Sequence, residues 1–252
     1  MTTPPERRAL LKAVYDEAKG CLRCPLHETR TTVVFGAGNA NADLMFIGEA
    51  PGANEDKQGL PFVGQAGKLL DKLLAEIGLE RRDVFVANVL KCRPPGNRDP
   101  HPAEIETCQE YLWQQVELIE PTVICTLGNF STKLLRGDST GISRLHGVPE
   151  VRIVGARAVR LYPLFHPAAA LYTPRMLETL RADFERLPEV LALGPPQQPD
   201  PVEPAFEPTF EPAFEPAGEP ARSDLLGPIP ELEPEEPPPP IEPEPATQLG
   251  LF

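Results

Sequence analysis

Cysteine is the residue type whose spacing says most about chemistry in this sequence. Cys21 and Cys24 form a C-x2-C pair, and fifteen residues separate Cys92 from Cys108. Four thiolates bind either a tetrahedral zinc ion or a [4Fe–4S] cluster. A zinc ribbon usually repeats the tight C-x2-C pair, whereas the second pair here is widely spaced. The spacing therefore favours a cluster, with a zinc site and unrelated thiols as the alternatives.

The surroundings of the fifth cysteine and the expected cellular compartment help to separate metal-binding thiols from other thiols. Cys125 lies inside the apolar run of residues 121–127 and is expected to be a small buried side chain. The first ten residues, MTTPPERRAL, lack the apolar segment of a signal peptide, and no run approaches the length of a membrane span. We therefore expect a cytoplasmic protein without a membrane partner. Thiols stay reduced in that compartment, so clustered cysteines indicate metal binding rather than disulfides.

Three further candidates for chemistry follow apolar, strand-like runs. Glu49 lies in the glycine-rich loop after the first run, Asn88 lies near the end of the second, and His166 follows a later one. A buried amide must find hydrogen-bond partners, and it could read the edge of a base. Each residue alone also has an ordinary interpretation: a solvated turn for Glu49, a strand-to-loop hydrogen bond for Asn88 and a structural role for His166. Phe62, in the stretch GLPFVG, would by itself be assigned to the core.

Alternating helices and strands are predicted to position these residues. Apolar periodicity predicts helices at residues 6–19, 67–77, 102–120 and 176–187, with another helix opening at 128, and strands at 43–48, 84–90, 121–127, 151–153 and 158–164. This order is typical of an α/β fold with a parallel sheet and helices on both faces. Sites in such folds lie at the carboxyl ends of the strands, which is where the three candidate loops would meet.

The composition changes at Pro195 and divides the chain. Residues 1–194 are predicted to form one globular domain, residues 195–247 a disordered, acidic, proline-rich linker with a four-residue EPAF-type repeat, and residues 248–252 an apolar-rich docking peptide. Residues 195–252 hold 13 acidic residues and one arginine, a net charge of −12, whereas the whole chain carries −13. The domain is therefore close to neutral, and the acidic total does not exclude a nucleic-acid partner.

Seven stretches of the sequence, taken together, resemble the family 4 uracil-DNA glycosylases, the thermostable iron–sulfur type of bacteria and archaea. These stretches are residues 21–24, 34–36, 48–56, 61–67, 88–98, 108 and 165–171. The resemblance implies a three-layer α/β/α sandwich around a four-stranded, mostly parallel sheet. It also implies that Cys21, Cys24, Cys92 and Cys108 bind a [4Fe–4S] cluster.

The activity implied by the resemblance is the excision of uracil from DNA, the step that leaves an abasic site in base excision repair. Such an enzyme must flip the nucleotide into a pocket before it hydrolyses the N-glycosidic bond. Phe62 would then stack on the flipped base, Asn88 would bind its O4 and N3, and His166 would stabilise the leaving anion at O2. Glu49 would position the attacking water, and Glu55 would fill the space beside C5, where the methyl group of thymine would clash.

The sequence departs from the family pattern in one place, because residues 52–54 contain neither Glu nor Asp. A related branch becomes crosslinked to the abasic product through a His in the loop after the third cysteine. The corresponding residues 92–98 contain no His, so turnover is expected. The alternatives are a non-catalytic or crosslinking protein that binds uracil-containing DNA, and a zinc-stabilised nucleic-acid-binding adaptor.

Two further sets of residues are expected to bind partners, with the domain itself monomeric. Residues expected to contact DNA are Lys91, Arg93, Arg98, Arg144 and Leu171. The terminal peptide resembles the pentapeptide by which bacterial repair proteins dock on the sliding clamp, which implies clamp contacts for Gln248, Leu249, Leu251 and Phe252. A short apolar peptide at the end of a long polar tether suits such recruitment.

Overall fold

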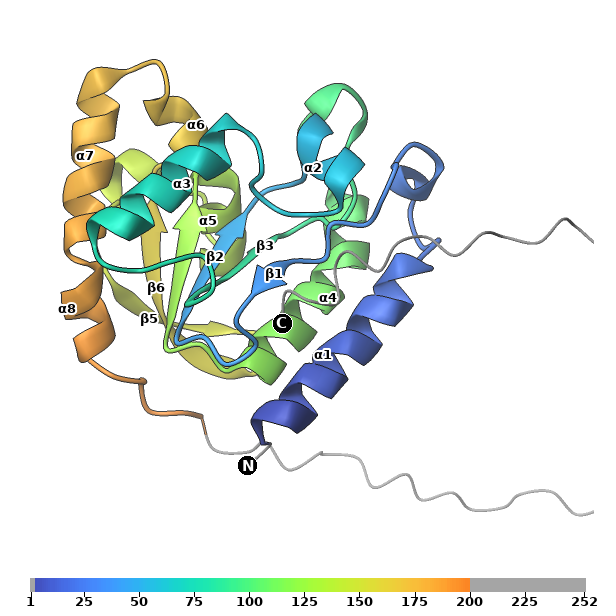
Figure 1. The fold of residues 1–252 in the computed structure, drawn as a ribbon, viewed down its shortest axis with the longest axis horizontal. Helices are drawn as coiled ribbons and strands as arrows, with labels where there is room; N and C mark the ends of the chain where they lie inside the picture. Colours follow the sequence, from blue (N-terminus) through green and yellow to red (C-terminus); the bar gives the residue numbers. More distant parts are fainter. Residues whose placement is uncertain (1–2, 200–252) are drawn as a thin grey trace, which may run out of the picture. The chain divides into compact units, whose positions relative to one another are not determined.

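A six-stranded sheet forms the centre of the protein, whose computed structural model describes residues 3–199 (Figure 1). Its strand order is β1-β3-β2-β4-β6-β5. The strands are β1 (Ala37–Gly38), β2 (Leu44–Gly48), β3 (Phe85–Asn88), β4 (Val123–Leu127), β5 (Glu150–Val154) and β6 (Arg157–Leu164). The predicted α/β class with a parallel sheet is confirmed.

The resemblance predicted a four-stranded sheet, and the structure has these four strands in the middle with one further strand at each edge. β3, β2, β4 and β6 run parallel, while β1 pairs antiparallel with β3 at one edge and β5 pairs antiparallel with β6 at the other. β1 has two residues, Ala37 and Gly38, too few to give a periodic pattern. β5 returns to the sheet because Gly155, with φ of 62°, closes a tight hairpin to β6.

Helices cover both faces of the sheet and give the predicted three layers (Figure 1). One face carries α1 (Pro4–Lys19), α4 (Pro102–Ile119) and α5 (Asn129–Arg136), and the other carries α3 (Gln65–Glu76), α7 (Pro174–Glu185) and α8 (Leu187–Ala192). β2 and β4 are buried along their whole length, as expected of central parallel strands that have helices on both sides.

Short helices occupy segments that the sequence indicated only as loops. α2 (Ala53–Gln58) follows the glycine-rich loop after β2, and α6 (Pro167–Ala170) follows β6. Three further turns of 3-10 helix are η1 (Pro25–Glu28), η2 (Pro95–Asn97) and η3 (Ile142–Arg144). Proline at the first helical position of α6 fits the helical φ and loses no hydrogen bond there, which explains how a helix begins directly after His166.

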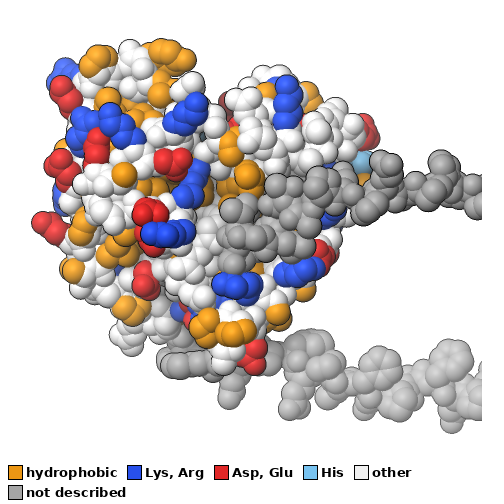
Figure 2. All heavy atoms as spheres, in the orientation of Figure 1, with side chains coloured by type: hydrophobic (Ala, Val, Ile, Leu, Met, Phe, Trp, Pro, Cys, Tyr) orange, Lys and Arg blue, Asp and Glu red, His pale blue; other side chains and the backbone are white. Residues whose placement is uncertain are grey.

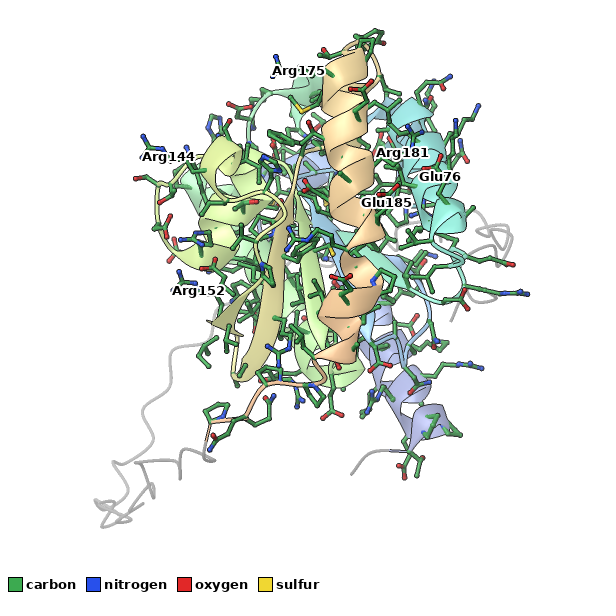
Figure 3. The ribbon with its side chains drawn as sticks, turned by 90° about the vertical axis from the view of Figure 1, so that its left-hand side faces the viewer. Glu76, Arg144, Arg152, Arg175, Arg181 and Glu185 are labelled. Carbon is green, nitrogen blue, oxygen red and sulfur yellow. The ribbon has the colours of Figure 1, made fainter. Side chains whose placement is uncertain are left out.

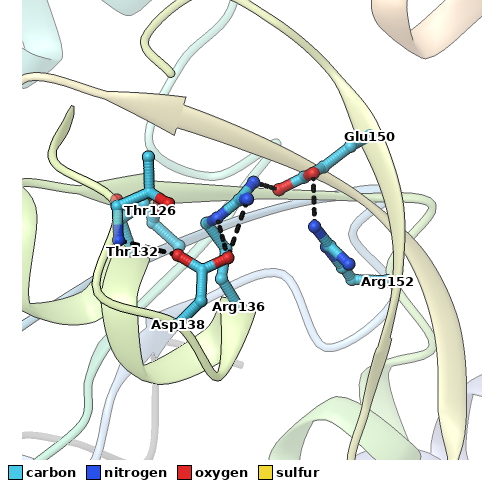
Figure 4. Close-up of polar contacts among 7 residues, drawn as sticks. Thr126, Thr132, Arg136, Asp138, Glu150 and Arg152 are labelled. Carbon is cyan, nitrogen blue, oxygen red and sulfur yellow. Dashed lines mark hydrogen bonds and ion pairs between the residues drawn. The ribbon is translucent and has the colours of Figure 1, made fainter. Parts of the chain in front are cut away.

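Ion pairs between elements fix two parts of this framework. Arg136, at the end of α5, contacts both Asp138 and Glu150 and thereby joins the helix to β5 (Figure 4). On the other face, Arg181 of α7 contacts Glu76 of α3 at 2.7 Å (Figure 3). On the face seen in Figure 2, Lys and Arg side chains are interspersed with Asp and Glu. No helix within residues 3–199 is both long and apolar enough to span a bilayer.

Candidate active site

A pocket of about 550 Å³ lies at the carboxyl ends of β2, β3 and β6. Residues from four loops line it, and those used below are Glu49, Glu55, Phe62, Asn88, His166 and Leu171. The sheet therefore brings together the residues that the sequence placed after separate strands. This is the position at which parallel α/β sheets bind ligands.

The Asn88 side chain is the polar group held most deeply in this pocket. Asn88 is 2% exposed, and its amide has no hydrogen-bond partner within residues 3–199. It stands in register with Gly48 on the neighbouring strand, where a methyl group would collide with the Asn88 amide oxygen and the Phe62 ring. Because Asn88 lines the pocket, its amide can complete its hydrogen bonds with a ligand that enters there.

Phe62 forms an aromatic wall of the pocket and has an uncommon backbone conformation. Its φ is 53°, in the left-handed region that non-glycine residues seldom adopt. Arg81 donates a 2.6 Å hydrogen bond to the Phe62 carbonyl, and the backbone of Gly67 packs so closely on that carbonyl that no side chain would fit. The surrounding contacts therefore hold the ring in place despite the backbone strain.

His166 faces Phe62 with 5.7 Å between the ring centroids. The backbone N–H of Ala168 donates a 3.1 Å hydrogen bond to His166 Nδ1, so the neutral ring carries its proton on Nε2. Burial lowers the pKa of His166 to about 4, although the charge of Glu55 acts in the opposite direction. The imidazole is therefore neutral near pH 7 and presents Nε2–H as a hydrogen-bond donor.

Two carboxylates lie in the pocket, in different environments. Burial, and then the charge of Asp99, raise the pKa of Glu49. Glu55, in the first turn of α2, accepts hydrogen bonds from the backbone N–H groups of Val63 (3.0 Å) and Gly64 (2.9 Å). Glu55 thus connects α2 to the Phe62 loop, while the Glu49 carboxylate makes no hydrogen bond within residues 3–199.

The residues predicted to contact DNA differ in how accessible their side chains are. Lys91 was predicted wrongly: its side chain is 1% exposed and donates to the Asn88 carbonyl (2.8 Å) and to Gln115 (2.6 Å). The sequence pattern places Lys91 just after a strand but cannot reveal that α4 covers it. Arg98 lies at the pocket and is bound by Glu104 through two contacts of 2.9 and 2.5 Å.

The other predicted DNA contacts are more accessible. Arg93 donates a 2.7 Å hydrogen bond to Asn97, and Arg144 lies exposed in η3 at the surface (Figure 3). Leu171 is half-buried and forms part of the pocket wall. Their role in binding DNA stays a prediction.

The four cysteines of the predicted cluster come from three separate parts of the chain and lie near one another. Burial raises the pKa of Cys108 to about 11, with further effects of the Lys91 amine and of the Cys92 and Cys24 thiols. Burial also raises the pKa of Cys92, to which Cys24 and Cys21 add. The fifth cysteine is fully buried in β4, as predicted.

Arg30 is a residue of this region that the sequence did not single out. It donates hydrogen bonds to Cys92 Sγ (3.3 Å) and to the Cys21 carbonyl (2.8 Å), and the Lys91 backbone N–H donates to Cys108 Sγ at 3.2 Å. Donors to sulfur suit thiolate ligands, whose negative charge they stabilise. Arg81 and Glu104 were missed in the same way, because each lies outside the recognised stretches and acts on a residue within one, Phe62 or Arg98.

The assembled pocket suits a flat, polar ring. It offers an aromatic face from Phe62, an amide that can both donate and accept from Asn88, and an N–H donor from His166. A carboxylate from Glu49 completes the set. A neutral N–H donor and a carboxylate in one pocket could stabilise an anionic leaving group and a cationic carbon as the bond between them breaks.

Comparison with known proteins agrees with this geometry. Residues 35–190 match the family model described as the Uracil DNA glycosylase superfamily. The chain is 47% identical over 185 residues to the Type-4 uracil-DNA glycosylase of Archaeoglobus fulgidus, covering 71% of this chain and 92% of that protein. It is 45% identical over 190 residues to the Type-4 enzyme of Sulfurisphaera tokodaii, covering 73% and 86%. The Type-4 enzyme of Thermotoga maritima is 43% identical over 166 residues, covering 66% and 85%.

Proposed function

We infer that this chain, which belongs to the Type-4 uracil-DNA glycosylases of the uracil-DNA glycosylase superfamily, removes uracil from DNA by hydrolysing its N-glycosidic bond. The single observation that carries the assignment to this pocket is the Asn88 amide, which faces the pocket opposite Gly48 and forms no hydrogen bond within residues 3–199. Uracil has a donor at N3 beside an acceptor at O4, and one amide can satisfy both. Cytosine presents a donor at that position instead, so it is mispaired when the Asn88 amide keeps the orientation that matches uracil.

The remaining side chains of the pocket have proposed roles in bond cleavage. The N-glycosidic nitrogen is inaccessible in stacked DNA, so the nucleotide is first flipped into the pocket, where Phe62 stacks on the base. The bond between uracil N1 and the sugar then breaks with its electron pair moving to uracil. His166 Nε2–H donates to O2, where the negative charge gathers.

Completion of the reaction requires a water molecule at the sugar carbon. Glu49 offsets the positive charge on the sugar and orients the water, whose oxygen bonds to the carbon and whose proton is released. Uracil leaves with a proton at N1, so the atoms of one water are divided between the two products. Glu55, held by Val63 and Gly64, borders the space beside C5 and would obstruct the methyl group of thymine.

The four cysteines Cys21, Cys24, Cys92 and Cys108 are proposed to bind a [4Fe–4S] cluster. No three His, Cys, Asp or Glu side chains in the described part of the chain are grouped tightly enough for one metal ion. The proposal is supported by the spacing of the cysteines and by the effects of the thiols on one another's pKa, which require them to lie near one another.

The proposed cluster would act as a brace rather than as a reactant. When bound, it would join the end of α1 to the loop after β3 and to α4, because Cys21, Cys92 and Cys108 belong to these parts. Hydrolysis of a glycosidic bond has no redox step for a cluster to supply. Arg30 already connects two of these segments through Cys21 and Cys92.

Recruitment by a sliding clamp is proposed from the sequence alone, since residues 248–252 lie outside the described residues. The boundaries at 194 and 247, a monomeric domain and a cytoplasmic location likewise remain predictions. Deleting residues 248–252 should abolish binding to the clamp in surface plasmon resonance and leave excision from oligonucleotides unchanged. Unchanged clamp affinity would refute the docking role.

The test of the main function is release of free uracil by the purified full-length protein. Duplexes with U:G and U:A pairs and a single-stranded oligonucleotide are each incubated with the protein, and products are resolved after alkaline cleavage of abasic sites. We expect uracil release with multiple turnovers. Binding without release, or one crosslinked product per protein, would instead identify a non-catalytic or crosslinking relative.

A further inference from the structure

Lys91 has a side chain that is sealed inside the protein, three residues after Asn88. It is 1% exposed. Its amine donates hydrogen bonds to the Asn88 carbonyl (2.8 Å) and to Gln115 Oε1 (2.6 Å), and it lies 5.8 Å from the centre of the Phe35 ring. Burial of an amine is costly unless hydrogen bonds compensate for the lost water. One of these compensating bonds is made to the backbone of the residue that is proposed to recognise uracil.

The Asn88 carbonyl lies where the pairing between the two strands β1 and β3 is interrupted. Continued by two residues beyond β1, the antiparallel register of these strands would place Phe35 opposite Asn88. Further along, the Val34 N–H donates to the Lys91 carbonyl at 2.8 Å, which is two residues out of that register. The backbone of β3 therefore bends away from its neighbour at the residue that lines the pocket.

Side chains bind the backbone at this interruption. The Asn88 carbonyl accepts from the Lys91 amine, and the Phe35 carbonyl accepts from Gln115 Nε2 at 2.9 Å. Because Gln115 also accepts from the amine through its Oε1, one continuous chain of hydrogen bonds crosses the gap. It takes the place of the backbone pair that a regular ladder would form there.

Helix α4 holds Lys91 at two points. Gln115 binds its amine, and Cys108, seven residues earlier on the same buried side of the helix, accepts a 3.2 Å hydrogen bond from the Lys91 backbone N–H. Both ends of the lysine are thus fixed on one rigid element. The amine has a defined position from which to hold the end of β3.

We propose that Lys91 is a positioning residue for uracil excision, whose amine fixes the Asn88 carbonyl and thereby the direction of the Asn88 amide into the pocket. This inference rests on the proposed function. The carbonyl and the side chain belong to the same residue, so a backbone that turns at this point displaces both. A displacement of roughly 1 Å is enough to impair a reaction that depends on orientation.

The first test is Lys91→Met under single-turnover conditions on a U:G duplex. Loss of a hydrogen bond from a charged donor should lower the excision rate about thirtyfold. The matched control is Tyr162→Phe, which removes another buried donor to a backbone carbonyl, the 2.9 Å bond to Asp183, outside the pocket. Its rate should stay unchanged. Equal reductions in the two variants would overturn the proposal.

A double-mutant cycle with Asn88→Ala separates positioning from a general structural effect. In the Asn88→Ala protein, Lys91→Met should lower the residual rate by less than about twofold, because the side chain that it positions is already absent. Gln115→Met removes the second acceptor of the amine, so it should lower the rate about threefold, and this effect too should vanish in Asn88→Ala. It provides the same test if Lys91→Met does not fold. Reductions that persist undiminished in Asn88→Ala would overturn the proposal.

Two further measurements exclude other routes for the effect. The affinity of Lys91→Met for a duplex with an abasic site, and its dependence on salt, should match the unchanged protein, because the sealed amine does not reach a phosphate. A weaker dependence on salt would overturn the proposal. Iron content should also be unchanged, and a loss of excision in proportion to lost iron would overturn the proposal.

Failure of the unchanged protein to release uracil would refute the proposed function. Normal release that Lys91→Met leaves unaltered would refute this inference alone.

Discussion

Gly48 and Asn88 lie opposite each other on the parallel strands β2 and β3, and the missing side chain of the first makes room for the amide of the second. A methyl group on Gly48 would also collide with the ring of Phe62. The position therefore controls two walls of the pocket at once. Its glycine is required by close approach and not by an unusual φ, since Gly48 is absent from the residues with positive φ.

Substitution of Gly48 by Ala should impair excision strongly. Displacing Asn88 and Phe62 by roughly 1 Å is expected to lower kcat/KM about a hundredfold. Single-turnover excision from a U:G duplex measures the effect. Gly141→Ala is the matched control, because a methyl group there meets nothing within 4 Å and the residue has no positive φ. Wild-type rates for Gly48→Ala would contradict the packing described here.

Removal of the Asn88 amide should abolish recognition of uracil while the fold survives. The change Asn88→Ala deletes an amide that lines the pocket and forms no hydrogen bond within residues 3–199, so the melting temperature should change little. Excision should fall by about 10⁴-fold, the discrimination typical of a buried hydrogen-bonding site. Asn41→Ala, in the turn before β2, serves as the control for excision and melting. Near-normal turnover in Asn88→Ala would refute its role.

The dependence on pH should distinguish Glu49 from His166. Because the pKa of His166 is lowered to about 4, the ring stays neutral through mildly acidic pH. The raised pKa of Glu49 means that the carboxylate is protonated first as the pH falls. In the unchanged protein, the single-turnover rate should therefore fall at acidic pH. In Glu49→Gln the rate should be low but independent of pH over the same range. If the rate of this variant still fell at acidic pH, the fall would have to be assigned to another titrating group.

The same histidine should also make stability depend on pH. The lowered pKa means that protonation favours the unfolded chain, where the ordinary value is about 6.5. The contribution of His166 to stability should be complete above about pH 6.5 and decline as the pH falls towards 4. The free energy of unfolding, measured with urea between about pH 6.5 and 4, should fall less steeply in His166→Asn than in the unchanged protein. Parallel declines in the two proteins would contradict the pKa shift.

Arg136 should contribute measurably to stability through its two carboxylate partners. The side chain is 9% exposed, and Arg136→Met would leave Asp138 and Glu150 without their shared cation (Figure 4). Its melting temperature should fall by about 3 °C. The exposed ion pair between Lys12 and Asp16 provides the control, because Lys12→Met should lower the melting temperature by about 1 °C or less. Equal decreases in the melting temperatures of the two variants, measured by differential scanning calorimetry, would refute a larger contribution from Arg136.

The proposed cluster can be tested with two cysteines that are both buried. Cys108→Ser should lose iron, brown colour and thermal stability, because Cys108 is a proposed ligand next to the Lys91 backbone. Cys125→Ala should retain iron and sulfide, since its thiol lies inside β4. Iron and sulfide analysis with the visible absorption spectrum is the measurement. Zinc in place of iron, or equal metal content in the two variants, would contradict the assignment.

Much of the fold and of the site follows from the sequence alone. Apolar periodicity placed all the strands from β2 to β6 and the long helices, because a buried face imposes its repeat on the residues that form it. The resemblance of the loops placed Glu49, Asn88 and His166 together, and the described pocket contains all three. The ends of helices were less predictable: α3 starts at Gln65, before its apolar repeat begins.

Only the tertiary structure decided the environment of each side chain. Lys91 and Arg98 look alike as cations near Cys92, yet one is sealed beneath α4 against Gln115 and the other pairs with Glu104 at the pocket. The proton position on His166 depends on the Ala168 N–H, and the depth of Asn88 depends on the register of β2 with β3. Periodicity reports that a residue is buried somewhere. Charge, tautomer and access to solvent depend on which distant segments pack against it, and local sequence does not carry that information.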